Sequence, residues 1–259
     1  ISNARKLCEI DRNFSTIVAG NKSASDEVEK VFSESGKDFV ITENVMPEFN
    51  KLNIEPAKQK IKELFISKII DAKGLNKVQS MTNSEIIPTP LAVLNGCELL
   101  SKGTDTTEGI GDLMAVDIGG ATTDVYSISA GTPTFENVMI KGLPEPYNKR
   151  TVEGDLGMRY SLPPLADQTD LNALSSEIGI DVDDILKWIE TCKKFPNTLA
   201  DKNSDNQKVE EGLAKSALKI AVERHTGKVE STFTPFGDMY IVTGKDLTKV
   251  GSVVGIGGG

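Results

Sequence analysis

In the first part of the chain, short continuous apolar runs alternate with apolar residues at helical spacing, a pattern typical of an α/β fold. Runs at 16–19 and 39–41 predict two strands, and the spacing between them predicts a helix that ends at Gly36. Ser23 and Asp26 have the spacing of a capping box at the start of that helix. Strand, helix and strand joined by short turns favour a parallel unit.

The same patterns predict further helices and strands downstream. Helices are expected after Pro56 and at 91–100, 181–193 and 206–225, and strands at 113–118, 123–129, 239–242 and 252–254. The first two of these strands should pair around a glycine turn. Residues 103–111 and the proline-punctuated stretch 144–164 are expected to be irregular.

Composition excludes several classes of function. The 259 residues include 29 Lys and Arg against 38 Asp and Glu, a formal charge of −9, which argues against a nucleic-acid partner. The widely spaced Cys8, Cys97 and Cys192 indicate reduced thiols and a cytoplasmic protein. One histidine, His225, leaves little room for zinc catalysis or a histidine-based triad. No apolar run reaches the roughly 18 residues that a membrane span needs, so we expect no membrane partner.

Some conspicuous residues have structural interpretations. His225 lies near a predicted helix end, where the helix dipole favours a positive charge, and we prefer that role to a ligand role. Trp188 and Cys192 share the apolar face of the helix 181–193, so we expect them in the core. Asp155 and Arg159 could form an ion pair that fixes a turn, or contact a ligand.

The segment 117–124, Asp-Ile-Gly-Gly-Ala-Thr-Thr-Asp, is the most informative stretch of the sequence. Glycines in a tight turn let backbone N–H groups approach an anion, and threonine hydroxyls can donate to phosphate oxygens. A carboxylate repels a phosphate unless a cation lies between them, so Asp117 indicates Mg²⁺, which binds few carboxylates and keeps its waters. A purely structural β-hairpin with a polar tip is the alternative. Two other glycine segments, 109–114 and 244–246, lack the spacing of a dinucleotide fingerprint and of a P-loop.

This segment resembles the second phosphate motif of the actin, sugar kinase and heat-shock chaperone ATPase superfamily. Residues 88–94 resemble the connecting helix of that superfamily and 254–259 its adenosine loop, in the same order along the chain. A closer resemblance, over nearly the whole chain, is to the glutamate mutase (methylaspartate mutase) accessory protein family. It is specific at 18–22, 42–47, 117–125, 150–159 and 244–248.

The resemblance implies an α/β, actin-like (ribonuclease H-like) ATPase fold. What remains of the first lobe, with the connecting helix, would occupy 1–111, and the second lobe 112–259. The implied cofactors are ATP or ADP and Mg²⁺. The implied partner is an adenosylcobalamin-dependent glutamate mutase. The implied function is that of a chaperone-like reactivating factor, which exchanges damaged cobalamin on the mutase through nucleotide-driven lobe closure.

Site residues follow from the same resemblance. Asp117 would hold the Mg²⁺ or the attacking water, and Asp124 would orient the hairpin or that water. The residues implied to face the β- and γ-phosphates are Gly119, Gly120, Thr122 and Thr123. Those implied to line the nucleoside are Gly255, Gly257 and Gly258, with Glu153 and Gly154 near its sugar.

Two other functions stay open at this point. A small-molecule kinase of the same superfamily needs a carboxylate base aimed at its acceptor hydroxyl. Besides Asp117 and Asp124, the sequence identifies no acidic residue for that role. Screening sugars and polyols for ATP-dependent phosphorylation would identify such a kinase. Sedimentation that depends on nucleotide would instead favour a filament or scaffold protein.

We expect these 259 residues to be an internal fragment, because the first phosphate hairpin of the superfamily should precede Ile1. With half of the phosphate cradle absent, ATP turnover by the fragment itself should be weak or undetectable. A nucleotide-binding and hydrolysis assay tests this, and micromolar affinity with brisk hydrolysis would contradict it.

Overall fold

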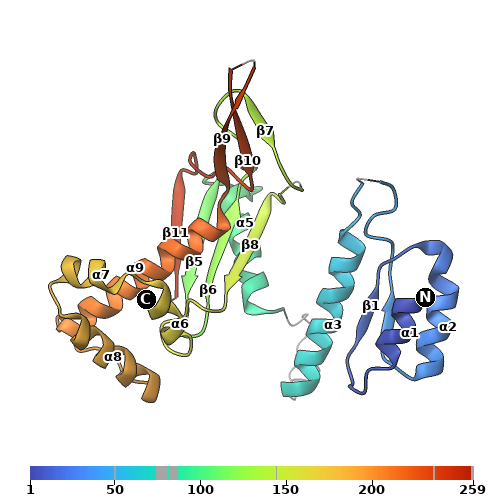
Figure 1. Cartoon of the computed structure of the whole chain (residues 1–259), viewed down its shortest axis with the longest axis horizontal. Helices are drawn as coiled ribbons and strands as arrows, with labels where there is room; N and C mark the ends of the chain where they lie inside the picture. Colours follow the sequence, from blue (N-terminus) through green and yellow to red (C-terminus); the bar gives the residue numbers. More distant parts are fainter. Residues whose placement is uncertain (50, 74–80, 82–86, 144, 236, 258–259) are drawn as a thin grey trace. The chain divides into compact units, whose positions relative to one another are not determined.

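The computed structural model describes residues 1–49, 51–73, 81, 87–143, 145–235 and 237–257. The chain divides into two compact units, Ile1–Thr89 and Pro90–Gly259 (Figure 1). Of the described helices, none is long and apolar enough to cross a membrane.

The first unit contains the predicted parallel pair of strands. β1 (Thr16–Val18) and β2 (Phe39–Ile41) pair in parallel, and α2 (Ser25–Ser35) connects them. Gly36 ends α2 with φ 67°, in the left-handed region that glycine adopts without strain. α1 (Ser2–Cys8) contacts α2, and α3 (Glu55–Lys73) contacts β1.

The predicted capping box of this unit is wrong. A short 3₁₀ helix, η1 (Lys22–Ala24), precedes α2, and the N-cap of α2 is Ala24, which makes no side-chain cap bond. The side chain of Asn21 caps η1 instead, because its Oδ1 accepts the Ser23 N–H at 3.0 Å.

The second unit is built around a four-stranded sheet in the order β11-β5-β6-β8. β5 (Leu113–Ile118) and β6 (Thr123–Ile128) form the predicted antiparallel hairpin, with Asp117 opposite Asp124. β8 (Asn148–Glu153) continues the sheet beyond β6, and β11 (Ser252–Ile256) pairs in parallel with β5.

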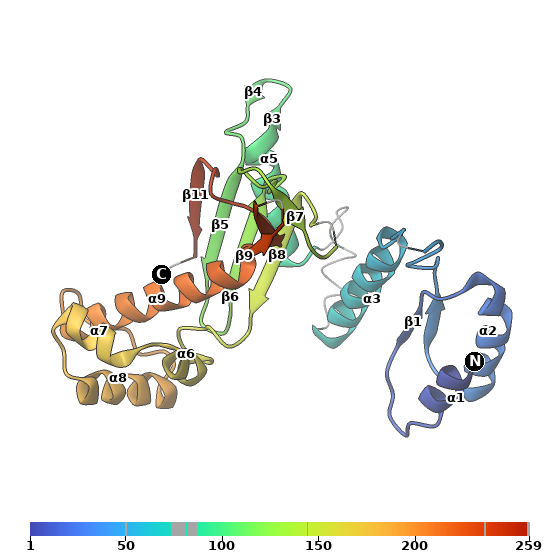
Figure 2. The ribbon, with the colours of Figure 1, turned by 45° about the horizontal axis from the view of Figure 1, so that its top comes forward.

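Side chains alternate between the two faces of this sheet, so that it forms a middle layer. Leu113 and Ala115 pack on one face with Cys97 of α5 (Thr89–Lys102). Val116 and Val125 pack on the other face with a helical layer, in which Trp188 and Cys192 are buried as predicted. That layer comprises α6 (Leu162–Gln168), α7 (Leu171–Ile178), α8 (Val182–Lys194) and α9 (Asp205–His225). Figure 2 shows α9 running beside the sheet, and it contacts β5, β6 and β8.

Two stretches expected to be irregular are ordered. The region 144–164 contains β8 and the start of α6, where Pro163 and Pro164 occupy the first turn, whose N–H groups lack helical partners in any case. Residues 103–111 contain the small hairpin of β3 (Gly103–Thr104) and β4 (Thr107–Glu108). A further sheet, β7-β10-β9, consists of β7 (Val138–Ile140), β10 (Gly237–Thr243) and β9 (Lys228–Thr234).

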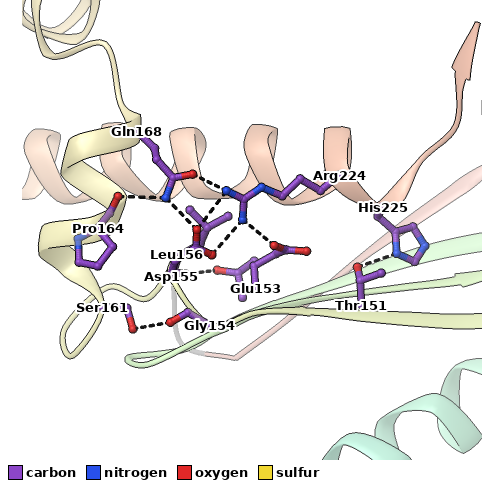
Figure 3. Close-up of polar contacts among 11 residues, drawn as sticks. Thr151, Glu153, Gly154, Asp155, Leu156, Ser161, Pro164, Gln168, Arg224 and His225 are labelled. Atoms are coloured by element: carbon purple, nitrogen blue, oxygen red, sulfur yellow. Dashed lines mark hydrogen bonds and ion pairs between the residues drawn. The ribbon is translucent and has the colours of Figure 1, made fainter.

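The predicted positive charge on His225 is wrong, because the side chain is fully buried. Its Nδ1 shares a hydrogen bond with Thr151 Oγ1 (Figure 3) and its Nε2 shares one with Ser127 Oγ, both at 2.8 Å. Lys245, also buried, donates to the same Ser127 oxygen and to the Ser129 and Tyr147 carbonyls. Burial, with the nearby Lys149 and Lys245, lowers the pKa of His225 to about 4, so the ring is neutral at pH 7.

His225 should make the fold sensitive to acid. In the unfolded chain its pKa is near 6.5, so the unfolded state takes up the proton first as pH falls. The contribution of His225 to the free energy of unfolding is therefore complete above pH 6.5. It is lost as the pH falls from about 6.5 to 4, a change on the order of 3 kcal/mol. Urea unfolding at pH 7.5 and 4.5 should show this loss in the wild type and a smaller loss in His225→Gln. An equal loss in both proteins would refute the assignment.

Candidate functional site

A cavity of about 970 Å³ lies at the turn between β5 and β6. Asp117, Gly119 and Gly120 line it from the hairpin, and Gly257 lines it from the end of β11. The opposite wall is one face of α9, formed by Gln207, Glu210, Glu211, Ala214, Lys215 and Leu218. Met158 and Arg159, together with Pro196, Asn197 and Leu199, complete the lining.

The turn leaves backbone donors available. The Gly119 N–H donates to the Thr122 carbonyl at 2.8 Å, which closes the hairpin. Within the described residues, the N–H groups of Gly120 and Ala121 have no hydrogen-bond partner. Unpaired N–H groups at a glycine turn are suited to binding an anion.

The carbonyl groups of the turn are all engaged by the segment 156–161, called here the docking loop. The N–H of Met158 donates to Gly119 O at 3.0 Å, and those of Arg159 and Tyr160 donate to Gly120 O at 2.8 and 2.7 Å. Ser161 Oγ donates to Ala121 O at 2.7 Å. The docking loop therefore satisfies the oxygen atoms of the turn and leaves its N–H groups for a ligand.

Close contact between this loop and the turn requires glycine at 157. A Cβ there would lie 2.4 Å from the Ala121 carbonyl carbon and 2.5 Å from its oxygen, much closer than van der Waals contact. Gly154, on the same stretch of chain, has open space around the equivalent position.

Asp117 and Gly257 are neighbours across the sheet. The register of β11 places Ile256 opposite Asp117, and Gly257 follows with φ +97°. A Cβ on Gly257 would lie 2.9 Å from Asp117 Oδ1. The Asp117 carboxylate makes no hydrogen bond or ion pair with any residue that the structure describes.

No cluster of three or more His, Cys, Asp or Glu side chains that could hold a metal occurs among the described residues. Asp117 is thus a single carboxylate beside free N–H groups. Mg²⁺ commonly binds through one or two carboxylates while phosphates and waters supply its other ligands, so this arrangement fits a nucleotide-bound Mg²⁺ and not an all-protein metal cage.

Three predicted site residues make contacts that hold the hairpin in place. Thr123 is fully buried and its hydroxyl donates to Leu156 O at 2.5 Å. Asp124 Oδ1 accepts from Arg150 Nε at 2.8 Å and Nη2 at 2.5 Å, while its Oδ2 accepts from Thr122 Oγ1 at 3.2 Å. The side chains of Thr122, Thr123 and Asp124 do not line the cavity, and the partners they have stabilise the hairpin.

Glu153 and Gly154 also lie outside the cavity lining, in the cluster shown in Figure 3. Arg224 Nη1 donates to Glu153 Oε2 at 2.6 Å and to Asp155 Oδ1 at 2.9 Å. The Arg224 guanidinium holds the pKa of Asp155 at about 2. The Gly154 carbonyl accepts from Ser161 Oγ at 2.8 Å.

The three glycines implied to line the nucleoside are not all at the cavity. Gly255 is exposed within β11, opposite Val116, and is not part of the cavity lining. Gly258 lies outside the described residues. Of the implied adenosine loop, Gly257 is therefore the described residue that lies beside Asp117 at the turn between β5 and β6.

Of the two roles left open for Asp155 and Arg159, the mutual ion pair does not form, because Asp155 pairs with Arg224. Arg159 Nη2 instead donates to Glu210 Oε1 at 2.7 Å, and both residues line the cavity. This α9 wall was not predicted. A signal for it exists, because its residues recur at i, i+3, i+4, i+7, i+8 and i+11 and so share one helix face.

Comparisons with known proteins agree with the family resemblance. A protein-family model described as "MutL protein" matches residues 1–259. "Protein MutL" of Clostridium tetanomorphum is 45% identical over 262 residues, an alignment that covers 100% of this chain and 56% of that protein. The chain thus spans about half the length of this curated relative.

A methyl group at residue 157 should disrupt the docking loop. Gly157→Ala is expected to destabilise the fold by about 2–3 kcal/mol, because the clash is with backbone atoms that cannot turn aside. Gly154→Ala is the matched control and should change stability by no more than about 0.5 kcal/mol. Urea unfolding measures both, and similar effects would show that the docking loop does not pack as described.

Proposed function

The chain belongs to the MutL protein family, and we propose that it is the nucleotide-binding part of an accessory protein that serves an adenosylcobalamin-dependent glutamate mutase. The family resemblance supports the choice of partner. The observation that supports nucleotide binding is the convergence of Asp117, Gly120 and Gly257 at one cavity, where the Gly120 N–H has no hydrogen-bond partner among the described residues. The formal charge of −9 is consistent with a partner other than nucleic acid.

The residues present fit MgATP. A volume of about 970 Å³ is at the upper end of the range for small-molecule sites. Glycine at 119, 120 and 257 lets a ligand approach the backbone without meeting a side chain. When bound, Mg²⁺ supplies the positive charge that allows a polyphosphate to lie next to the Asp117 carboxylate.

Each group then has a role in the proposal. Asp117 holds the hydrated metal ion, and the Gly120 and Ala121 N–H groups donate to phosphate oxygens. Thr122, Thr123 and Asp124 act on the phosphates indirectly, by fixing the hairpin through the contacts to Leu156 and Arg150. Asp124 would therefore contribute to catalysis indirectly, by orienting the hairpin.

We further propose that the second unit is a lobe of an actin-like ATPase. The hairpin, the docking loop and the residue after β11 meet at one end of the sheet, and helical layers cover both of its faces. In this proposal the turn would hold the phosphates of ATP together with a second phosphate-binding hairpin. Loss of the γ-phosphate would favour separation of the lobes, and this population shift would allow the mutase to exchange damaged cobalamin.

Asp117→Asn tests this function in the full-length protein. Removing the metal-binding charge should lower ATP hydrolysis and ATP-dependent reactivation of a damaged glutamate mutase by at least about tenfold. The free energy of unfolding should change by less than about 0.5 kcal/mol, because Asp117 makes no ion pair with any described residue. Hydrolysis rates, mutase activity and urea unfolding provide the three measurements.

Asp124→Asn is the matched control. It weakens the pair with Arg150, so it should destabilise the fold by about 1–3 kcal/mol and retain more hydrolysis than Asp117→Asn. Full hydrolysis in Asp117→Asn would rule out the role assigned to this carboxylate. If the wild type hydrolyses ATP but does not affect a glutamate mutase, the proposed ATPase activity stands and the proposed partner is wrong.

A further inference from the structure

Arg159 is fixed beside the phosphate turn. Its backbone N–H donates to the Gly120 carbonyl at 2.8 Å, and a Cβ built on Gly120 would lie 3.6 Å from the Arg159 Cβ. Its side chain extends along the cavity to α9, where Nη2 donates to Glu210 Oε1 at 2.7 Å. Nη1 donates to the Met158 carbonyl at 2.7 Å.

The guanidinium group retains capacity for a ligand. It carries five N–H donors in a planar fork that matches two oxygen atoms of a phosphate, and the contacts to Glu210 and Met158 occupy two of them. The side chain of Arg159 is 15% exposed and that of Glu210 is 21% exposed, so the pair is mostly shielded from water but open to the cavity.

Lys215 is the other cation among the described residues that line the cavity, and it is placed differently. Its side chain is 69% exposed, and its Nζ lies 3.5 Å from Oε1 of Glu177, a residue that does not line the cavity. Arg159, by contrast, is held at the turn by its backbone bond to the Gly120 carbonyl, and both residues line the cavity. An anion bound at the Gly120 N–H would therefore lie in the same cavity as the Arg159 side chain.

We propose that Arg159 is a phosphate-binding side chain that Glu210 holds until a nucleoside polyphosphate displaces the carboxylate. This inference rests on the proposed nucleotide-binding function and adds the residue that recognises the polyphosphate. Carboxylate and phosphate compete for the same fork, and a polyphosphate brings more negative charge and more acceptor oxygens. The backbone bond to Gly120 keeps Arg159 at the turn during the exchange.

A structural brace between the docking loop and α9 is the competing explanation. The two explanations differ in the effect of removing each partner. If the pair is only a brace, loss of Arg159 and loss of Glu210 both loosen the cavity and both weaken binding. If Glu210 restrains a binding residue, loss of Arg159 weakens binding and loss of Glu210 strengthens it.

Calorimetric titration of the full-length protein with MgATP separates these cases. Arg159→Gln should raise the Kd by at least about tenfold, and Arg159→Lys should be intermediate, because an ammonium group is a point charge without the fork. Glu210→Gln should lower the Kd by about threefold to tenfold. Glu211→Gln is the matched control, since Glu211 lines the same cavity and its Oε1 accepts from Gln207 rather than from Arg159.

The Glu211→Gln control tests whether tighter binding results simply from the loss of a negative charge in the cavity. Any lost carboxylate favours an anion somewhat, so Glu211→Gln should lower the Kd less than Glu210→Gln. In an Arg159→Gln background, Glu210→Gln should have no greater effect than Glu211→Gln. Urea unfolding of each variant shows that the folded protein is being titrated, and Glu210→Gln tests the inference even if Arg159→Gln does not fold.

The outcomes separate the two proposals. If the wild type does not bind MgATP, the proposed function fails and the role of Arg159 fails with it. If the wild type binds and Arg159→Gln binds equally well, the function stands and the inference is overturned. Weaker binding in Glu210→Gln, or equal effects of the two glutamate variants, would also overturn it.

Discussion

The candidate site depends on the hydrogen bonds between the docking loop, residues 156–161, and the turn between β5 and β6. Two consecutive glycines have little conformational preference of their own, so Gly119 and Gly120 do not fix the turn alone. Three backbone N–H groups and the Ser161 hydroxyl hold its carbonyl groups from one side. This interaction sets the direction of the carbonyl oxygens, which would repel a phosphate, and leaves the N–H groups of Gly120 and Ala121 unpaired.

Much of the fold could be predicted because burial leaves a periodic trace in the sequence. β5 is covered on both faces and is a continuous apolar run, while α8 buries one apolar stripe, so both were predicted within a residue or two. β8 and β9 were missed for the opposite reason. Each lies at the edge of its sheet and carries several polar residues, so no continuous apolar run marks it in the sequence. The prolines of α6 concealed a helix start.

The site was predictable only where its chemistry is local in sequence. Asp117 and the glycines of the turn occur in one short segment, and the structure places them at one cavity with Gly257. The pair of Arg159 and Glu210 joins residues 51 positions apart, and no local pattern indicates it. The protonation state of His225 also depends on tertiary structure, because the end of an exposed helix favours a charge whereas burial against Ser127 and Thr151 does not.

The electrostatics of the cavity explain why a nucleotide would need both a metal ion and Arg159. Among its described lining residues, the carboxylates of Asp117, Glu210 and Glu211 outnumber the cations of Arg159 and Lys215, so an unaccompanied polyphosphate meets net repulsion. Mg²⁺ at Asp117 would offset one carboxylate, and exchange of Arg159 from Glu210 to a phosphate would redirect an existing cation. That exchange would free Glu210 on α9, while Arg224 holds the C-terminal end of this helix to Glu153 and Asp155. One guanidinium group would therefore link occupancy of the cavity to the attachment of α9 to the docking loop.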